Sequence, residues 1–307
     1  LNALARAGTP ESVGTVLDWI EREPELRARA LLPIYPLEYS RACPEQVFPR
    51  LLALTDGHPG ESSALSALYA YVNDGCLTSA QLAECTPYVL RAAERFDERS
   101  RQPHPPHDTD QEAWIGELAK TIDILGRFPG AEALAFAQRT LAHPNPWPRL
   151  FAVRALLLKN GILSREVIEP LAACAQTRAL LYRYLAEAGR VNQFPAKWAT
   201  RSAFAESAMV DWLTYPTELA TVPDEIEEMG RFPATTSEGE AEYFVYRFRT
   251  FEPHWAAKEG WMAGVAGPYL CDASLPPRGG GGTFSQFKSW GAMSAEEHLR
   301  AIVEPSG

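Results

Sequence analysis

One pattern repeats along most of this chain and restricts its fold more than any other feature. From about Thr9 to Gln193, a capping residue is followed by a stretch with helical spacing of apolar side chains, and then by Pro or Gly. Thr9-Pro10 is a typical helix start. The apolar residues after it share one face: Val13, Val16, Leu17 and Ile20. No segment in this span alternates apolar and polar residues as a half-buried strand does, so the region is predicted to be all-helical.

Further helices are predicted by the same reasoning at 44–54, 63–72, 78–99, 109–128, 130–142, 148–159, 164–175 and 177–188. Thr78 with Gln81 and Thr109 with Glu112 have the spacing of capping boxes. The connections are mostly short, which favours antiparallel neighbours. One such pair is too small to bury its own apolar face, so the pairs are expected to stack on one another.

Residues 147–175 resemble a HEAT repeat. The resemblance depends on Pro148, Ala152, Val153, Arg154, Leu156, Leu157, Gly161, Val167, Ile168, Pro170, Leu171 and Cys174. It implies a first helix with a Val-Arg pair, a tight turn and a second apolar helix, and it implies a structural role for Arg154. The Asp that often accompanies this Arg is not evident. The predicted fold is therefore mainly α: residues 1–192 form a right-handed, HEAT-like α-solenoid of antiparallel helix pairs.

The character of the chain changes after residue 192. Of the 32 aromatic residues, 17 lie between Phe194 and Trp290. Residues 243–251 favour a strand, residues 261–265 are its expected partner, and Ser294 with Glu297 caps a final helix. We expect residues 193–307 to form a small α+β domain that covers the open end of the array.

Charge argues against nucleic acid as the main partner. The net charge is −10, and residues 216–307 hold 14 acidic and 7 basic residues. A nucleic-acid scaffold normally presents a strongly basic stripe. The middle of the chain is weakly basic, so nucleic-acid binding remains an alternative if its arginines form a continuous stripe. These arginines are Arg149, Arg154, Arg178, Arg183 and Arg190.

Composition indicates a cytoplasmic, bacterial protein. The five scattered cysteines form no Cys-x-x-Cys pair, which is typical of reduced thiols. No window is apolar enough for a transmembrane helix, and the first residues lack the pattern of a signal peptide. Arg outnumbers Lys 24 to 5, as in GC-rich bacterial coding.

Three constellations resemble sites, and each has a simpler reading. His104 and His107, with Asp108 and Asp110, lie in a proline-rich loop whose ordering would oppose metal binding. The glycines 279–282 lack the Lys and Ser or Thr of a phosphate-binding loop. Residues 296–298 begin a helix and point in different directions. No complete catalytic motif is present, so we expect no cofactor and no metal, and catalysis is disfavoured but left open.

The acidic segment 222–242 has two readings. It holds seven carboxylates against one Arg231, and it is either a solvated connector or a docking surface for a basic protein. In the second reading, neighbouring tryptophans serve as anchors, although either could instead be core. The candidate partner-binding residues are Asp224, Glu225, Glu227, Glu228, Glu240, Trp255 and Trp261.

These features together predict a non-catalytic protein-binding scaffold. One concrete form is an immunity or antitoxin-like protein that sequesters a basic partner. The alternative is an enzyme with a site between the helical array and the C-terminal segment, which would have to bring together His254, Arg247, Glu242 and Asp272. The sequence leaves the oligomeric state and the identity of the partner open.

Overall fold

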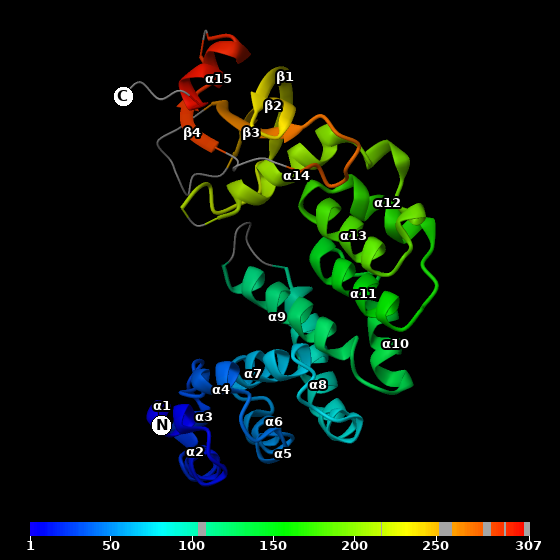
Figure 1. The fold of residues 1–307 in the computed structure, drawn as a ribbon. Helices are drawn as coiled ribbons and strands as arrows, with labels where there is room; N and C mark the ends of the chain where they lie inside the picture. The colour runs from blue at the N-terminus through cyan, green and yellow to red at the C-terminus, as the bar shows by residue number, and fades with distance from the viewer. Residues whose placement is uncertain (104–108, 216, 252–259, 279–283, 292, 304–307) are drawn as a thin grey trace. The chain divides into compact units, whose positions relative to one another are not determined.

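The computed structural model describes residues 1–103, 109–215, 217–251, 260–278, 284–291 and 293–303. The described chain is mainly helical and has one small antiparallel sheet towards its C-terminal end (Figure 1). Contacts between residues divide it into two compact units, Leu1–Leu163 and Ser164–Gly307. No helix within the described ranges is both long and apolar enough to cross a bilayer.

The described residues of the first unit are organised entirely by helices. Its helices are α1 (Asn2–Ala7), α2 (Pro10–Arg22), α3 (Pro24–Arg27), α4 (Tyr35–Ser40), α5 (Pro44–Val47), α6 (Arg50–Thr55), α7 (Glu61–Asn73), α8 (Ser79–Ser100), α9 (Thr109–Leu125), α10 (Ala131–Thr140) and α11 (Pro146–Leu158). The caps predicted at Thr9 and Thr78 are confirmed, because each hydroxyl accepts a hydrogen bond from the third amide of its helix. The cap predicted at Thr109 lies outside what the structure describes, because the side chain of Thr109 and the five residues before it are not described.

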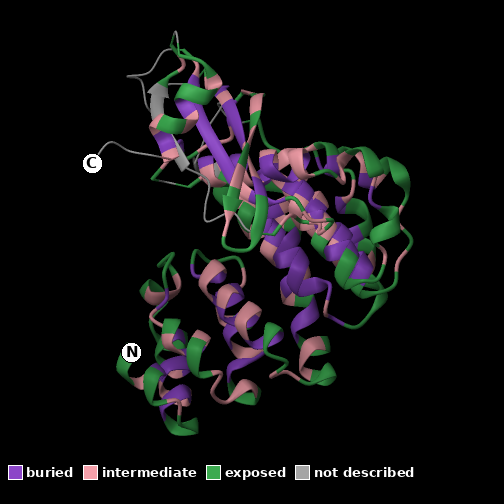
Figure 2. Ribbon diagram, turned by 45° about the horizontal axis from the view of Figure 1, so that its top comes forward, coloured by how far each residue is buried: buried purple, intermediate pink, exposed green. Residues whose placement is uncertain are grey.

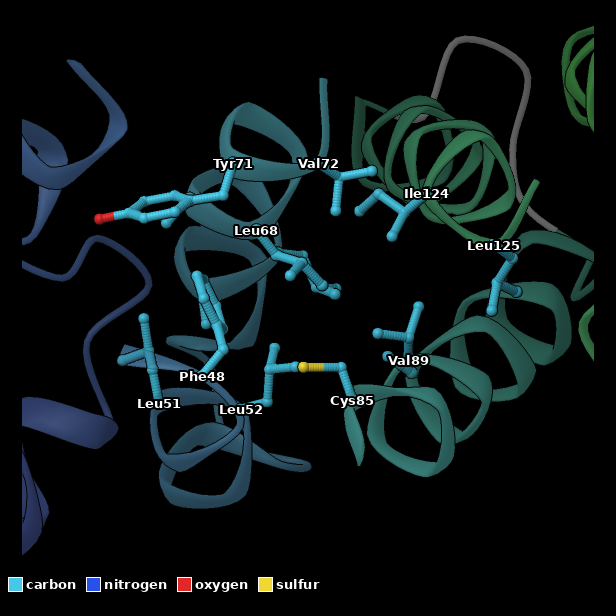
Figure 3. Packing of buried hydrophobic residues seen from close by; sticks show 14 of the residues in the cluster. Phe48, Leu51, Leu52, Leu68, Tyr71, Val72, Cys85, Val89, Ile124 and Leu125 are labelled. Atoms are coloured by element: carbon cyan, nitrogen blue, oxygen red, sulfur yellow. The ribbon is translucent and has the colours of Figure 1, made fainter. Parts of the chain in front are cut away.

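One hydrophobic core runs through the first unit. Figure 3 shows Leu68 and Tyr71 of α7, Leu52 of α6, and Cys85 and Val89 of α8 pointing into it. Consecutive helices contact each other in the pairs α6–α7, α8–α9 and α10–α11. Each helix of a pair also contacts its counterpart in the next pair, through α6–α8, α7–α9, α8–α10 and α9–α11.

A buried ion-pair centre joins α9 to α11. The Asp123 side chain has no solvent exposure, and its carboxylate lies 2.7 Å from Nη1 of Arg154 and 3.1 Å from Nη1 of Arg127. A buried carboxylate without such donors would be strongly destabilising. The structural role expected for Arg154 agrees with this contact. Its partner was not recognised from the sequence because Asp123 lies on a different helix.

The second unit combines helices with a four-stranded sheet. Its elements are α12 (Arg165–Ala173), α13 (Ala175–Glu187), η1 (Val191–Gln193), η2 (Ala196–Trp198), α14 (Arg201–Leu213), β1 (Glu225–Thr236), β2 (Gly239–Arg249), β3 (Met262–Leu270), β4 (Phe284–Ser289) and α15 (Ala295–Val303). The strand order is β1-β2-β3-β4, and neighbouring strands are antiparallel. The predicted pairing of residues 243–251 with 261–265 is confirmed by the β2–β3 ladder.

Both faces of the central strands are covered, which explains the nearly continuous apolar run in β2. Phe244, Tyr246 and Phe248 face Met209 and neighbouring residues of α14. Val245 belongs to the opposite face, where it packs in a cluster that includes Ile302 of α15. Side chains alternate across a strand, so a strand buried on both faces needs apolar residues at successive positions. Figure 2 shows the central strands in the buried colour.

The compact units divide earlier in the chain than the predicted boundary between residues 192 and 193. Helices α12 and α13 belong with the sheet because α13 packs on α14, which in turn packs on β3. Arg178 reinforces this packing from a position that is only 1% exposed. It donates hydrogen bonds to the carbonyls of Ala172, Ala173 and Ala203 and pairs with Glu206 at 2.8 Å.

Candidate functional site

The acidic segment 222–242 is not a solvated connector, because most of it forms strand β1 and pairs with β2. Glu225 lies opposite Arg249, and Glu227 lies opposite Arg247. The Nε atoms of Arg249 and Arg247 are 2.6 Å and 2.8 Å from these two carboxylates. Opposite charges directly across an antiparallel pair stabilise it modestly. We call these four residues the cross-strand ladder.

The predicted anchor Trp261 lies against the same ladder. The guanidinium groups of Arg247 and Arg249 lie 4.4 Å and 4.6 Å from its ring centroid. Trp261 is half-buried, and its role as an anchor for a partner stays a prediction. Trp255 lies outside the described residues. The ladder thus presents compensated charge beside an aromatic ring and is not a purely acidic surface.

The other predicted acidic residues have separate environments. Glu228 pairs with Arg231 at 2.6 Å and also contacts the Ser202 hydroxyl. Asp224 accepts a hydrogen bond of 2.6 Å from the amide of Phe251. Glu240, near the start of β2, is exposed, and like Asp224 it has no ion pair with a described residue.

A pocket of about 540 Å³ lies beside Glu240. Arg231, Glu242 and Cys271 also line it, and Glu242 pairs with Arg201 at 3.0 Å. The pocket is therefore mixed in charge, and its only free carboxylate among the described lining residues is that of Glu240. It offers hydrogen-bonding groups at its surface but no nucleophile–base pair among these residues.

The residues proposed for an enzymatic site are engaged separately in the second unit. Arg247 pairs with Glu227, Glu242 with Arg201, and Asp272 with Arg278. Hydrogen bonds with Ser274, and after them the contact with Arg278, lower the pKa of Asp272 to about 2. His254 lies outside the described residues.

The five arginines considered as a basic stripe do not share an environment. Arg178 is buried, Arg154 pairs with buried Asp123, and Arg183 lies 3.8 Å from Glu187. Arg178 therefore contributes nothing to a surface. An intrachain carboxylate also compensates the charge of Arg154 and Arg183, which removes two more positions from a phosphate-binding stripe.

The other residue groups singled out from the sequence form no metal or catalytic site within the described ranges. His104, His107 and the glycines 279–282 lie outside them, and so does the side chain of Asp110. Glu297 caps α15, as its hydrogen bonds with Ser294 show, while His298 stacks on Trp290. Across the residues that the structure describes, no three His, Cys, Asp or Glu side chains are grouped as metal ligands.

The comparisons with known proteins add no relative. No protein-family model matches the chain, and no curated protein or solved structure matches it either.

Proposed function

We propose that this chain is a non-catalytic, protein-binding scaffold that captures a basic partner, as an immunity or antitoxin-like protein would. In this proposal the helices of the first unit form a right-handed α-solenoid of antiparallel pairs similar to HEAT repeats. The second unit supplies the acidic contact region.

The contacts in the first unit support the array. In a stack of helix pairs, each helix packs on its own partner and on the equivalent helix of the next pair. Helices α6 to α11 have this pattern, through contacts within three successive pairs and between them. The buried Asp123–Arg154 ion pair adds a polar link between two of these pairs.

The distribution of unpaired charge carries the proposal of a basic partner. The ladder and Arg231 neutralise Glu225, Glu227 and Glu228 within the chain. Glu238 in the β1–β2 turn and Glu240 near the start of β2 are exposed and have no ion pair with a described residue. We call these two residues the acidic hairpin tip. Unpaired surface carboxylates attract a cationic surface and accelerate encounter.

The ladder can contribute as a second contact. Its ion pairs are partly exposed, and such pairs stabilise a fold by only about 0 to 1 kcal/mol. A partner's cationic groups can therefore replace the intrachain arginines at small cost. Trp261 beside them offers the type of aromatic ring that is enriched at binding hot spots.

The test is capture from lysate of the native host, with stepwise elution by salt. The expected result is a defined basic protein that is retained at low salt and released as salt rises, because exposed charges are screened. The double variant Glu238→Gln/Glu240→Gln should lose retention. The matched control Glu84→Gln/Glu98→Gln removes two exposed carboxylates from α8 and should retain the partner. Absence of a salt-sensitive partner, or equal loss in both variants, would overturn the proposal.

A further inference from the structure

A second pocket lies within the second unit, between α13, α14 and the segment that follows β3. Its volume is about 280 Å³, slightly below the usual range of about 300–1,000 Å³ for drug-sized ligands. The walls are mainly apolar and come from residues far apart in the sequence: Ala175, Ala179, Leu180, Phe204, Ala208, Tyr269, Pro276 and Pro277. Phe204 and Tyr269 are buried residues, so they form the interior side of the pocket.

Three polar groups of this pocket have no partner among the described residues. They are the carboxylate of Asp211, the amide of Gln176 and the hydroxyl of Tyr269. The remaining polar residue, Ser207, already donates a hydrogen bond of 3.1 Å to the Ala203 carbonyl. None of the three is a polar group sealed from solvent, so each can hydrogen-bond a molecule that enters the pocket. An apolar cavity with a few polar groups along its lining is typical of a small-molecule site.

Asp211 is unfavourably placed for the stability of the fold. It lies in the last turn of α14, where the negative end of the helix dipole repels a carboxylate, and no basic residue is present in that turn. The residue is exposed, which places it at the rim of the pocket, yet burial against the apolar walls raises the pKa of its carboxyl. No described cation compensates this loss of hydration.

We propose that this pocket binds an organic cation with an apolar stem, an alkylguanidinium or alkylammonium, with Asp211 as its counter-ion. The stem packs between Phe204, Tyr269 and the alanines, and Gln176 and the Tyr269 hydroxyl accept further hydrogen bonds from the charged head. A lysine or arginine side chain of a bound protein has this chemistry, and so does a free alkylamine. The site is independent of the acidic hairpin tip, so it stands even if that surface binds nothing.

The test uses the full chain with ¹³C-labelled alanine methyl groups and titration with n-butylguanidinium. Saturable shifts are expected at Ala175, Ala179 and Ala208, while Ala133 and Ala137 of the first unit should not respond. The uncharged isostere n-butylurea should bind roughly tenfold or more weakly, because it lacks the charge-assisted hydrogen bond.

Two variants isolate the counter-ion. Asp211→Asn should weaken n-butylguanidinium binding by a similar factor, whereas Glu187→Gln, which removes an exposed carboxylate from α13, should leave it unchanged. A parallel titration with N-acetylarginine methylamide distinguishes the sources. Binding of both cations indicates a protein side chain as ligand, and binding of n-butylguanidinium alone indicates a small free amine. Unshifted pocket alanines, equal binding of n-butylurea, or unchanged affinity of Asp211→Asn would each overturn the proposal.

Discussion

At the scale of single residues, several polar side chains of this protein are buried with complete sets of partners. His143 is 2% exposed, and its Nδ1 accepts a hydrogen bond of 3.1 Å from the Asn145 amide. Ser100 donates to the carbonyl of Asp97, so its oxygen is available to accept from Nε2 of His143 at 3.0 Å. Such an arrangement fixes the neutral tautomer that carries its proton on Nε2.

This geometry predicts a loss of stability in mild acid. Burial, and then the nearby Arg101 guanidinium, lowers the pKa of His143 in the folded state. The unfolded chain therefore takes up a proton first, below about pH 6.5. The contribution of His143 to stability is complete above that pH and declines as the pH falls toward the lowered folded pKa. Urea unfolding at about pH 7.5 and about pH 5.5 measures it, and His143→Gln should show a shallower dependence. Equal slopes for the two proteins would contradict the assignment.

Arg178 gives a second prediction at this scale. Its replacement by Met leaves the carbonyls of Ala172, Ala173 and Ala203 without their donor and breaks the pair with Glu206. Because Glu206 keeps 31% exposure, water compensates part of the loss, and the free energy of unfolding should fall by about 3 kcal/mol. Arg183→Met on the same helix removes an exposed ion pair and a distant contact with the Tyr184 ring, and it should cost less than about 1 kcal/mol. Chemical denaturation of both variants measures the two losses. Similar losses of unfolding free energy would show that the buried hydrogen bonds of Arg178 contribute no more than an exposed ion pair.

At the scale of elements, close approach of helices depends on small residues. A Cβ added at Gly126, just after α9, would lie 2.8 Å from the Cα of Ala155 in α11. That contact is with backbone, so the helices must move apart to relieve it. Gly116 lies within α9, and a Cβ there meets no atom within 4 Å.

A Gly→Ala substitution is therefore expected to change the stability in opposite directions at the two positions. Gly126→Ala should destabilise the protein by about 1–3 kcal/mol through overpacking. Gly116→Ala should stabilise it by about 0.4–1 kcal/mol, because alanine loses less backbone entropy in a helix. Thermal unfolding measured by circular dichroism compares them directly. A stabilised Gly126→Ala variant would mean that α9 and α11 do not approach as closely as described.

Strand β1 could not be recognised from its own sequence. The carboxylates of residues 222–242 have the composition of a solvated segment, and Pro233 lies among them. Their pairing with Arg247 and Arg249 depends on a register that is set by β2. A pattern search within the segment cannot detect charges that are compensated from another strand.

At the scale of the whole molecule, the excess of acid is the dominant electrostatic property. The net charge is −10, and three of the five arginines considered as a basic stripe are buried or paired: Arg154, Arg178 and Arg183. Phosphate backbones are bound through unpaired cationic groups, with strong salt dependence. We therefore expect no retention of DNA or RNA in a filter-binding assay at low salt, with a basic protein of similar size as the positive control. Retention that disappears as salt rises would contradict this expectation.

The features that depend on short-range patterns could be predicted from the sequence. The helix starts at Thr9 and Thr78, the apolar face of α2 and the β2–β3 pair follow from spacings of a few residues, because capping and periodicity are local effects. Which charges remain unpaired, and where the compact units divide, depends instead on how the chain packs. The Asp123–Arg154 pair and the cross-strand ladder depend on partners from distant segments, whereas Asp211 is packed beside distant apolar residues with no described cation near it. The electrostatic environment of a side chain is set by its neighbours in space, which the linear pattern does not specify.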